Sequence, residues 1–531
     1  MSLTLDDDVI GEILAWCEVS TVLSCAQVSR RFNTIASSKQ LWIRLLCRLQ
    51  NADLIPPKIL SDEILDSNDG AALVGEIKRI ILGPRSWSSE TPNPMRTPSS
   101  ASALLTPSSA MVLRSPAPVR IRQHARFRVA DFSEPDSLAL VTKMRLLAGG
   151  RYLLVYCYHP NAGGAKVVHL YNTQTGARVE ADPFGVEIDP VVSPSVDVLP
   201  GEDVAFVASA RYINSVQYGA KIQRIDLPTG ELEDVWSAVL PVEIISLEWP
   251  ELTLAGDILV ITYGRIGFYA RERPKTLVIN WRLKQYAFLT VPKTDTQLKI
   301  ALAPGFIFAT FRSASLDTHS LNVYPLESLR WREIDELATY EPSTMDHFFF
   351  NTTPIISERF AIAESSSALA VHRNPLSLDC FKILLYISPA ESAFSPTLPS
   401  RPESPQGFRL LDSIAAVLPI SAPPQPVLAP TLFSYHFDPA TREWAQRSAT
   451  PAPALTIAGD EIRELTYSGY ASIGSPTCGV VDLRRERERK MRRSGDAPLG
   501  LATQMHASSL TPYSSAIASF DENEVEIIEF L

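Results

Sequence analysis

Two patterns of apolar residues divide this chain. In residues 7–46, apolar positions recur three to four residues apart, as on one face of an α-helix. Beyond about residue 120 this spacing disappears, and short runs rich in β-branched and aromatic residues replace it. The sequence therefore predicts a small all-α domain over residues 1–50 and an all-β domain over residues 119–531.

Four short helices are predicted within the first fifty residues. The apolar face of the first consists of Val9, Ile10, Ile13, Leu14 and Cys17. Three aspartates precede it, and their charge suits a helix N-terminus. The N-caps of the next three helices are expected at Ser20, Ser29 and Ser38. A bundle this small buries too little apolar area to be robust alone, so we expect it to dock on another surface.

A connector and a linker follow the predicted bundle. Residues 51–83 hold a further helix that ends at Gly83-Pro84. Residues 84–118 contain seven Pro, nine Ser and three Thr, which predicts a disordered linker. Its Thr-Pro and Ser-Pro steps are candidate kinase sites, and each phosphate would add about −1.5 to −2 charges. These sites are Thr91, Thr97, Thr106 and Ser115. The alternative is a passive linker in which such dipeptides occur by chance.

The all-β part has a period near fifty residues. Strand-like runs follow turn-like residues at steps of 51, 55, 49 and 53, marked by Gly150, Gly201, Gly256, Gly305 and Glu358. Further strand–turn units recur at a similar period, at 167–176, 222–230, 277–284, 321–328 and 432–441. A period of this length built from hairpins is typical of a β-propeller. We expect about seven blades, with six or eight as alternatives, and a pair of β-sandwiches as the rival fold.

Two insertions interrupt the predicted propeller. Residues 388–430 contain ten prolines, and residues 484–509 begin with a run of seven basic and two acidic residues at 484–493. The basic run is a candidate nuclear import signal or a patch for an acidic partner. The alternative is a solvated loop or helix between strands.

Composition narrows the classes of function. The 531 residues are 45% hydrophobic and carry a net charge of −10, which disfavours nucleic acid and anionic membranes as partners. No apolar run approaches 18 residues, and the N-terminus does not resemble a signal peptide. The six cysteines form no CxxC pair, so no metal or cofactor is expected. Sparse cysteine predicts a reducing compartment, cytoplasmic and/or nuclear.

Three segments of the helical part together resemble the F-box family. They are LDDDVIGEIL at 5–14, VSRRFNTIA at 28–36 and LW at 41–42. Asp6 and Ser29 depart from the family pattern, which has Pro and Cys there. The resemblance implies binding to the Skp adaptor and, through it, to a cullin ubiquitin ligase of the SCF type. The candidate adaptor-binding residues are Leu5, Ile10, Ile13, Leu14, Leu23, Val28 and Trp42. The alternative is a helical cap packed on its own protein.

The resemblance also implies a non-catalytic function. The chain would be a substrate-recognition subunit whose propeller binds a target protein for ubiquitination. The alternatives are a non-degradative scaffold and a propeller hydrolase, although no nucleophile elbow, phosphate loop or HExxH motif occurs. Four arginines recur soon after the marker strands and are candidate target-binding residues on one face of the ring. They are Arg211, Arg265, Arg312 and Arg373. Independent solvated arginines are the alternative.

Overall fold

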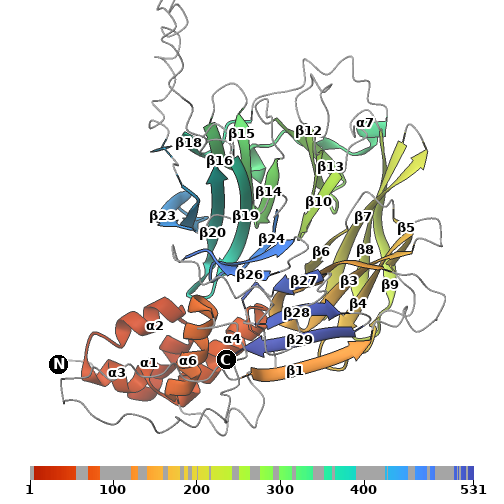
Figure 1. Ribbon diagram of the computed structural model, residues 1–531. Helices are drawn as coiled ribbons and strands as arrows, with labels where there is room; N and C mark the ends of the chain where they lie inside the picture. Colours follow the sequence, from red (N-terminus) through yellow and green to blue (C-terminus); the bar gives the residue numbers. More distant parts are fainter. Residues whose placement is uncertain are drawn as a thin grey trace, which may run out of the picture.

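The fold is described from a computed structural model, shown in Figure 1. The structure describes residues 5–55, 70–83, 121–128, 140–159, 165–179, 184–188, 194–199, 201–214, 217–241, 250–263, 275–290, 298–313, 318–338, 352–361, 365–389, 425–426, 429–452, 461–474, 479–484, 507–510, 512–513, 516–521 and 524–530. The candidate phosphorylation sites Thr91, Thr97, Thr106 and Ser115 lie outside them, as do residues 390–424 and 485–506 of the two expected insertions.

The N-terminal part folds into helices, as predicted. They are α1 (Asp7–Trp16), α2 (Val19–Cys25), α3 (Arg30–Ala36), α4 (Lys39–Asn51) and α6 (Gly70–Leu82). Buried side chains of α6 join the same core as those of α1 and α4. We call these five helices the helical module.

The predicted caps are confirmed at two of three positions. Ser29 Oγ accepts a hydrogen bond from the Phe32 N–H, and Ser38 Oγ accepts one from the Leu41 N–H. The prediction at Ser20 is wrong, because α2 begins at Val19 and its N-cap is Glu18. The Ser20 N–H instead donates to Leu376 O in the β-rich part, at 3.1 Å.

The strands form seven sheets, numbered here in chain order. Sheet 1 contains β2 (Leu140–Leu146), β3 (Tyr152–His159), β4 (Ala165–Asn172) and β5 (Phe184–Ile188). Sheet 2 contains β6 (Ser195–Val198), β7 (Val204–Asn214), β8 (Gln217–Asp226) and β9 (Leu232–Pro241). Sheet 3 contains β10 (Pro250–Ala255), β11 (Ile258–Tyr263), β12 (Lys275–Asn280), β13 (Gln285–Thr290) and β17 (Arg332–Glu333).

Sheets 4 to 7 continue the series. Sheet 4 contains β14 (Lys299–Ala303), β15 (Phe306–Ser313), β16 (Thr318–Pro325), β18 (Ile356–Ala361) and β21 (Gln425–Pro426). Sheet 5 contains β19 (Ser365–Asn374), β20 (Ser377–Pro389), β22 (Thr431–Asp438) and β23 (Glu443–Pro451). Sheet 6 contains β24 (Glu461–Leu465), β25 (Tyr470–Gly474) and β26 (Gly479–Asp482). Sheet 7 contains β27 (Ala507–Leu510), β28 (Ala516–Asp521), β29 (Glu524–Phe530) and β1 (Ile121–Arg128). A short helix, α7 (Asp335–Ala338), follows β17.

These sheets follow one another around a ring, which confirms the propeller prediction. Each sheet contacts the next along the chain, and β27 of sheet 7 contacts β2 of sheet 1. Sheets 1 to 5 are complete blades of at least four strands. Sheet 6 has three described strands, and sheet 7 pairs β29 with β1 from the start of the β-rich region. The ring therefore has five complete blades rather than the seven expected from the sequence, together with two sheets of different construction, and both ends of the region meet in sheet 7.

The repeat predicted from sequence corresponds to one turn of each blade. Gly150, Gly201, Gly256 and Gly305 all have positive φ and lie in the turn between the first and second strands of sheets 1 to 4. The fifth marker is wrong, because Glu358 lies inside β18 of sheet 4. The equivalent turn of sheet 5 is Pro375-Leu376, which contains no glycine to reveal it.

The helical module lies against the face of the ring formed by these turns. Leu376, Leu378 and Tyr513 pack on its apolar core. Glycines mark two further contacts: a Cβ on Gly201 would lie 2.7 Å from Asn51 O, and one on Gly83 would lie 2.5 Å from the Tyr470 ring. Module and propeller are therefore in close contact at several turns (Figure 1).

Substitution of Gly201 tests this contact. Gly201→Ala and Gly305→Ala both place a Cβ on a backbone of positive φ, which costs about 1–2 kcal/mol. At Gly305 nothing lies within 4 Å of the added Cβ, so it is the matched control. We expect Gly201→Ala to lower the free energy of unfolding by at least about 1 kcal/mol more than Gly305→Ala in urea titrations. Equal losses would contradict the contact with Asn51.

Candidate protein-binding surface

Helix α1 has two apolar faces, only one of which is buried. Ile10 and Leu14 point into the core of the module, whereas Val9, Ile13 and Trp16 are exposed. The exposed three are spaced four and three residues apart, so they share one face of the helix. Ile13 is 51% exposed and Trp16 is 80% exposed. This face is therefore an apolar stripe that remains exposed among the residues that the structure describes.

Two further exposed apolar residues lie near the start of this stripe. Leu5 precedes α1 and Val28 precedes α3, and both side chains are mostly exposed. Arg31 of α3 joins the two regions, because its guanidinium contacts the Asp7 carboxylate at 2.6 Å and the carbonyl of Leu5. We call Leu5, Val9, Ile13, Trp16 and Val28 the exposed apolar surface. Half of the ten exposed large apolar residues of the described chain lie in it, and such clustering marks interaction sites.

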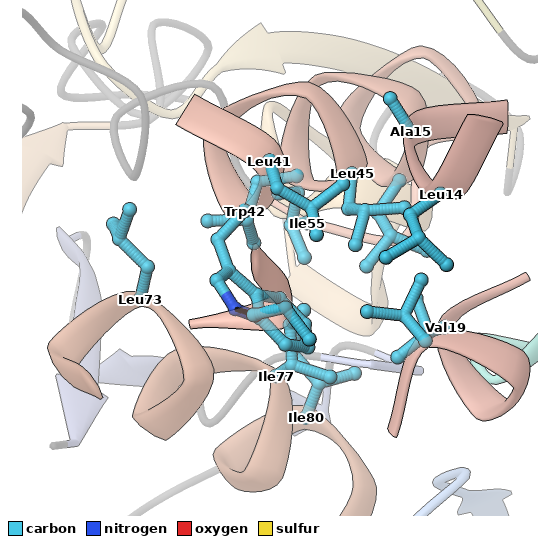
Figure 2. Packing of buried hydrophobic residues seen from close by; sticks show 14 of the residues in the cluster. Leu14, Ala15, Val19, Leu41, Trp42, Leu45, Ile55, Leu73, Ile77 and Ile80 are labelled. Atoms are coloured by element: carbon cyan, nitrogen blue, oxygen red, sulfur yellow. Dashed lines mark hydrogen bonds between the residues drawn. The ribbon is translucent and has the colours of Figure 1, made fainter. Parts of the chain in front are cut away.

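The core behind α1 fixes which face is exposed. Figure 2 shows side chains of α1, α4 and α6 pointing toward one another, with Trp42 among them. Trp42 is 2% exposed, and its indole N–H donates to Ala36 O at 2.7 Å. Because α1 packs its Ile10–Leu14 side on α4 and α6, its other apolar face turns outward.

The structure corrects part of the predicted surface. Ile10, Leu14 and Trp42 belong to the core and are not accessible to a partner in this arrangement, and Leu23 is partly buried against that core. Leu5, Ile13 and Val28 are exposed. Sequence reasoning left out Val9 and Trp16, although their spacing from Ile13 is the signal that places them on its face of the helix.

The four candidate arginines do not share one face of the ring. Arg312 lies near the end of β15 opposite to the turn at Gly305, and Arg211 lies similarly on β7. Arg373 lies at the β19–β20 turn, beneath the helical module, where its Nε–H donates to Leu378 O at 2.7 Å. Arg265 is outside the described residues. The hypothesis of a common arginine mouth is therefore wrong, because Arg373 belongs to the opposite face.

A small cavity lies where the helical module meets the propeller, a contact region that we call the joint. Its volume is about 180 Å³, and Glu18, Arg48 and Arg373 are among its lining residues. Glu18 connects the two parts directly, because Ser377 Oγ donates to its carboxylate at 2.5 Å. The joint between module and propeller thus combines apolar packing with partly buried polar contacts.

Sheets 5 and 6 enclose a cluster of buried polar side chains. Lys382 Nζ donates to Tyr467 O at 2.7 Å, the Tyr467 hydroxyl donates to Asn374 Oδ1 at 2.9 Å, and His372 Nε2 donates to Leu465 O at 2.8 Å. Burial lowers the pKa of Lys382 to about 8 and that of His372 to about 4. These hydrogen bonds hold the β24–β25 turn of sheet 6 against sheet 5.

The described ranges contain neither a candidate membrane-spanning helix nor a candidate metal site. None of the helices there combines the length and apolar character needed to cross a bilayer. Nor do three or more His, Cys, Asp or Glu side chains gather there in a group able to hold a metal ion.

Asp53 places a carboxylate in the joint. It follows α4, has a positive φ of 53°, and its Oδ2 accepts a hydrogen bond from the Gly201 N–H at 3.2 Å. Burial raises its pKa from 3.8 to about 6, although the Gly201 hydrogen bond and Arg151 act in the opposite direction. The folded state therefore binds this proton more tightly than the unfolded chain does. The resulting stability is present below about pH 4 and is lost as the pH rises through 6.

Replacing Asp53 tests this assignment. Asn tolerates positive φ and can still accept the Gly201 hydrogen bond, so Asp53→Asn removes mainly the charge. At pH 7.5 we expect the free energy of unfolding of the variant to exceed that of the wild type by on the order of 1 kcal/mol, a value reduced for partial solvent exposure. Near pH 4 we expect the two free energies to be equal. Urea midpoints at the two pH values measure this difference.

Asp257→Asn is the control for this test, because Asp257 forms an exposed ion pair with Arg282 at 2.6 Å. It should give no gain at pH 7.5. A loss of stability at pH 7.5 in Asp53→Asn would show that the charge of Asp53 is favourable at the joint.

Comparisons with known proteins identify the helical part. Residues 2–44 match the model of the F-box domain. No curated protein matches the chain. Among solved structures, the chain is similar to a putative 6-phosphogluconolactonase from Bacteroides fragilis, with 13% identity, a TM-score of 0.35, and coverage of 71% of this chain and 90% of that one. It is also similar to the β-propeller domain of the trilobed protease from Pyrococcus furiosus, with 9% identity, a TM-score of 0.30, and coverage of 64% and 81%.

Proposed function

Because this chain is an F-box protein with a C-terminal β-propeller, we propose that it is the substrate-recognition subunit of an SCF-type ubiquitin ligase. In this function the helical module binds a Skp-type adaptor, which connects the chain to a cullin. The propeller binds a target protein. The chain performs no chemistry of its own and needs no cofactor, and it works in the cytoplasm and/or the nucleus.

The exposed apolar surface is the observation that carries this proposal. Five exposed apolar residues lie within the residues that match the F-box domain, namely Leu5, Val9, Ile13, Trp16 and Val28. Burying such side chains against a partner is favourable by about 25 cal/mol per Å² of apolar area. An amphipathic helical surface of this kind suits docking on an apolar groove of the adaptor.

The position of the module indicates where a target would bind. The module occupies the side of the ring with the turns at Gly201 and Pro375-Leu376. Strands β7 and β15 start near that side and end on the opposite side of the ring, to which we assign the target. A target held there would be kept near the ubiquitin-transfer enzyme, so that its lysines react at a high effective concentration.

An isoleucine pair tests adaptor binding. Ile13 and Ile213 are 51% and 49% exposed, one on α1 and the other on β7. We expect Ile13→Asp to weaken binding of a purified Skp-type adaptor by at least about tenfold, since it places a charge in the apolar contact. Ile213→Asp should bind like the wild type. Biolayer interferometry with the full chain provides the affinities.

Two results would count against the proposal. A wild-type chain that does not bind the adaptor would favour a scaffold function without a ligase. Equal weakening by both substitutions would show that a general loss of folding, rather than the α1 surface, is responsible.

A further inference from the structure

We propose that Trp16 is the main anchor of the adaptor interface, so that the interface extends along α1 to its C-terminal end. This inference rests on the proposed function. Trp16 lies beyond the segment of α1 that resembles the F-box pattern, because that segment ends at Leu14.

Trp16 is more exposed than any other large apolar residue of the described chain. Its side chain is 80% exposed, the largest value among the exposed apolar residues of the described chain. The other described tryptophans are buried or partly buried. Tryptophan buries more apolar area than any other residue when it enters an interface, and it is enriched among residues that dominate binding energy. An uncovered indole in line with Val9 and Ile13 is therefore the strongest available contact on this face.

The backbone around Trp16 is held in place from two sides. Within the module, the Arg48 guanidinium donates to Ala15 O at 3.1 Å and to Cys17 O at 2.8 Å. From the propeller, Ser377 Oγ donates to the Glu18 carboxylate, and Leu376 O accepts from the Ser20 N–H. The residues before and after Trp16 are thus fixed, and little backbone entropy is lost when its side chain is bound.

Two ion pairs join α1 to neighbouring helices beside the stripe. Glu12 contacts Arg44 of α4 at 2.6 Å, and Asp7 contacts Arg31 of α3 at 2.6 Å. Each pair neutralises its own charges and is exposed at the surface. An apolar centre with a polar rim is the arrangement found at protein interfaces, where the rim excludes water and the centre provides the binding energy.

Calorimetry with a purified Skp-type adaptor and the full chain tests this inference. We expect Trp16→Ala to weaken binding by about 30-fold or more, the change that corresponds to a dominant contact. Trp16→Phe, which keeps an aromatic ring, should weaken it by less than about fivefold. Leu283→Ala is the control, because Leu283 is 63% exposed but lies on the propeller. All variants should unfold like the wild type, since neither side chain contributes to a core.

Fluorescence provides an independent measurement. Binding of the adaptor should shift the emission of the wild-type chain to shorter wavelength, because Trp16 leaves water, and Trp16→Phe should remove that shift. If Trp16→Ala binds within twofold of the wild type while Ile13→Asp does not bind, the inference is overturned and the proposed function stands. If the wild-type chain does not bind the adaptor, both are overturned.

Discussion

The apolar core shared by the helices and the propeller is the contact on which the rest of the structure depends. A bundle of five short helices buries too little area to be stable alone. Leu376 of the β19–β20 turn, Leu378 of β20 and Tyr513 pack against its core, while α6 supplies Leu73, Ile77 and Ile80. The module is therefore folded against the ring, and its orientation is determined by the same contacts that stabilise it.

This core also determines which surface remains for a partner. Because the side chains of Ile10 and Leu14 pack in the core, the second apolar face of α1 is the one that remains exposed. Helix α1 and the propeller consequently belong to one packed unit, with polar contacts from Glu18 and Asp53 across the joint. A partner on α1 and a target on the ring would be held at a fixed separation, which is the property that a substrate receptor needs.

Sequence reasoning found what local chemistry specifies. Ser29 and Ser38 are caps because a hydroxyl before a helix satisfies a free N–H, and Gly150, Gly201, Gly256 and Gly305 mark turns because their φ is positive. Features that depend on tertiary contacts could not be predicted from the sequence. The predicted cap at Ser20 is displaced where its N–H binds Leu376 O, and a propeller turn without glycine left no marker. Which face of α1 is buried depends on how it packs on α4 and α6. The buried Ile10 and the exposed Ile13 therefore could not be distinguished from sequence alone.

Hydrogen–deuterium exchange of the full chain, with and without a purified Skp-type adaptor, tests whether the exposed apolar surface binds the adaptor. We expect slower exchange on adaptor binding in residues 5–16 and around Val28, with the strands of sheets 1 to 5 unchanged. Protection confined to the propeller, or no change in α1 under conditions where the adaptor is bound, would contradict it.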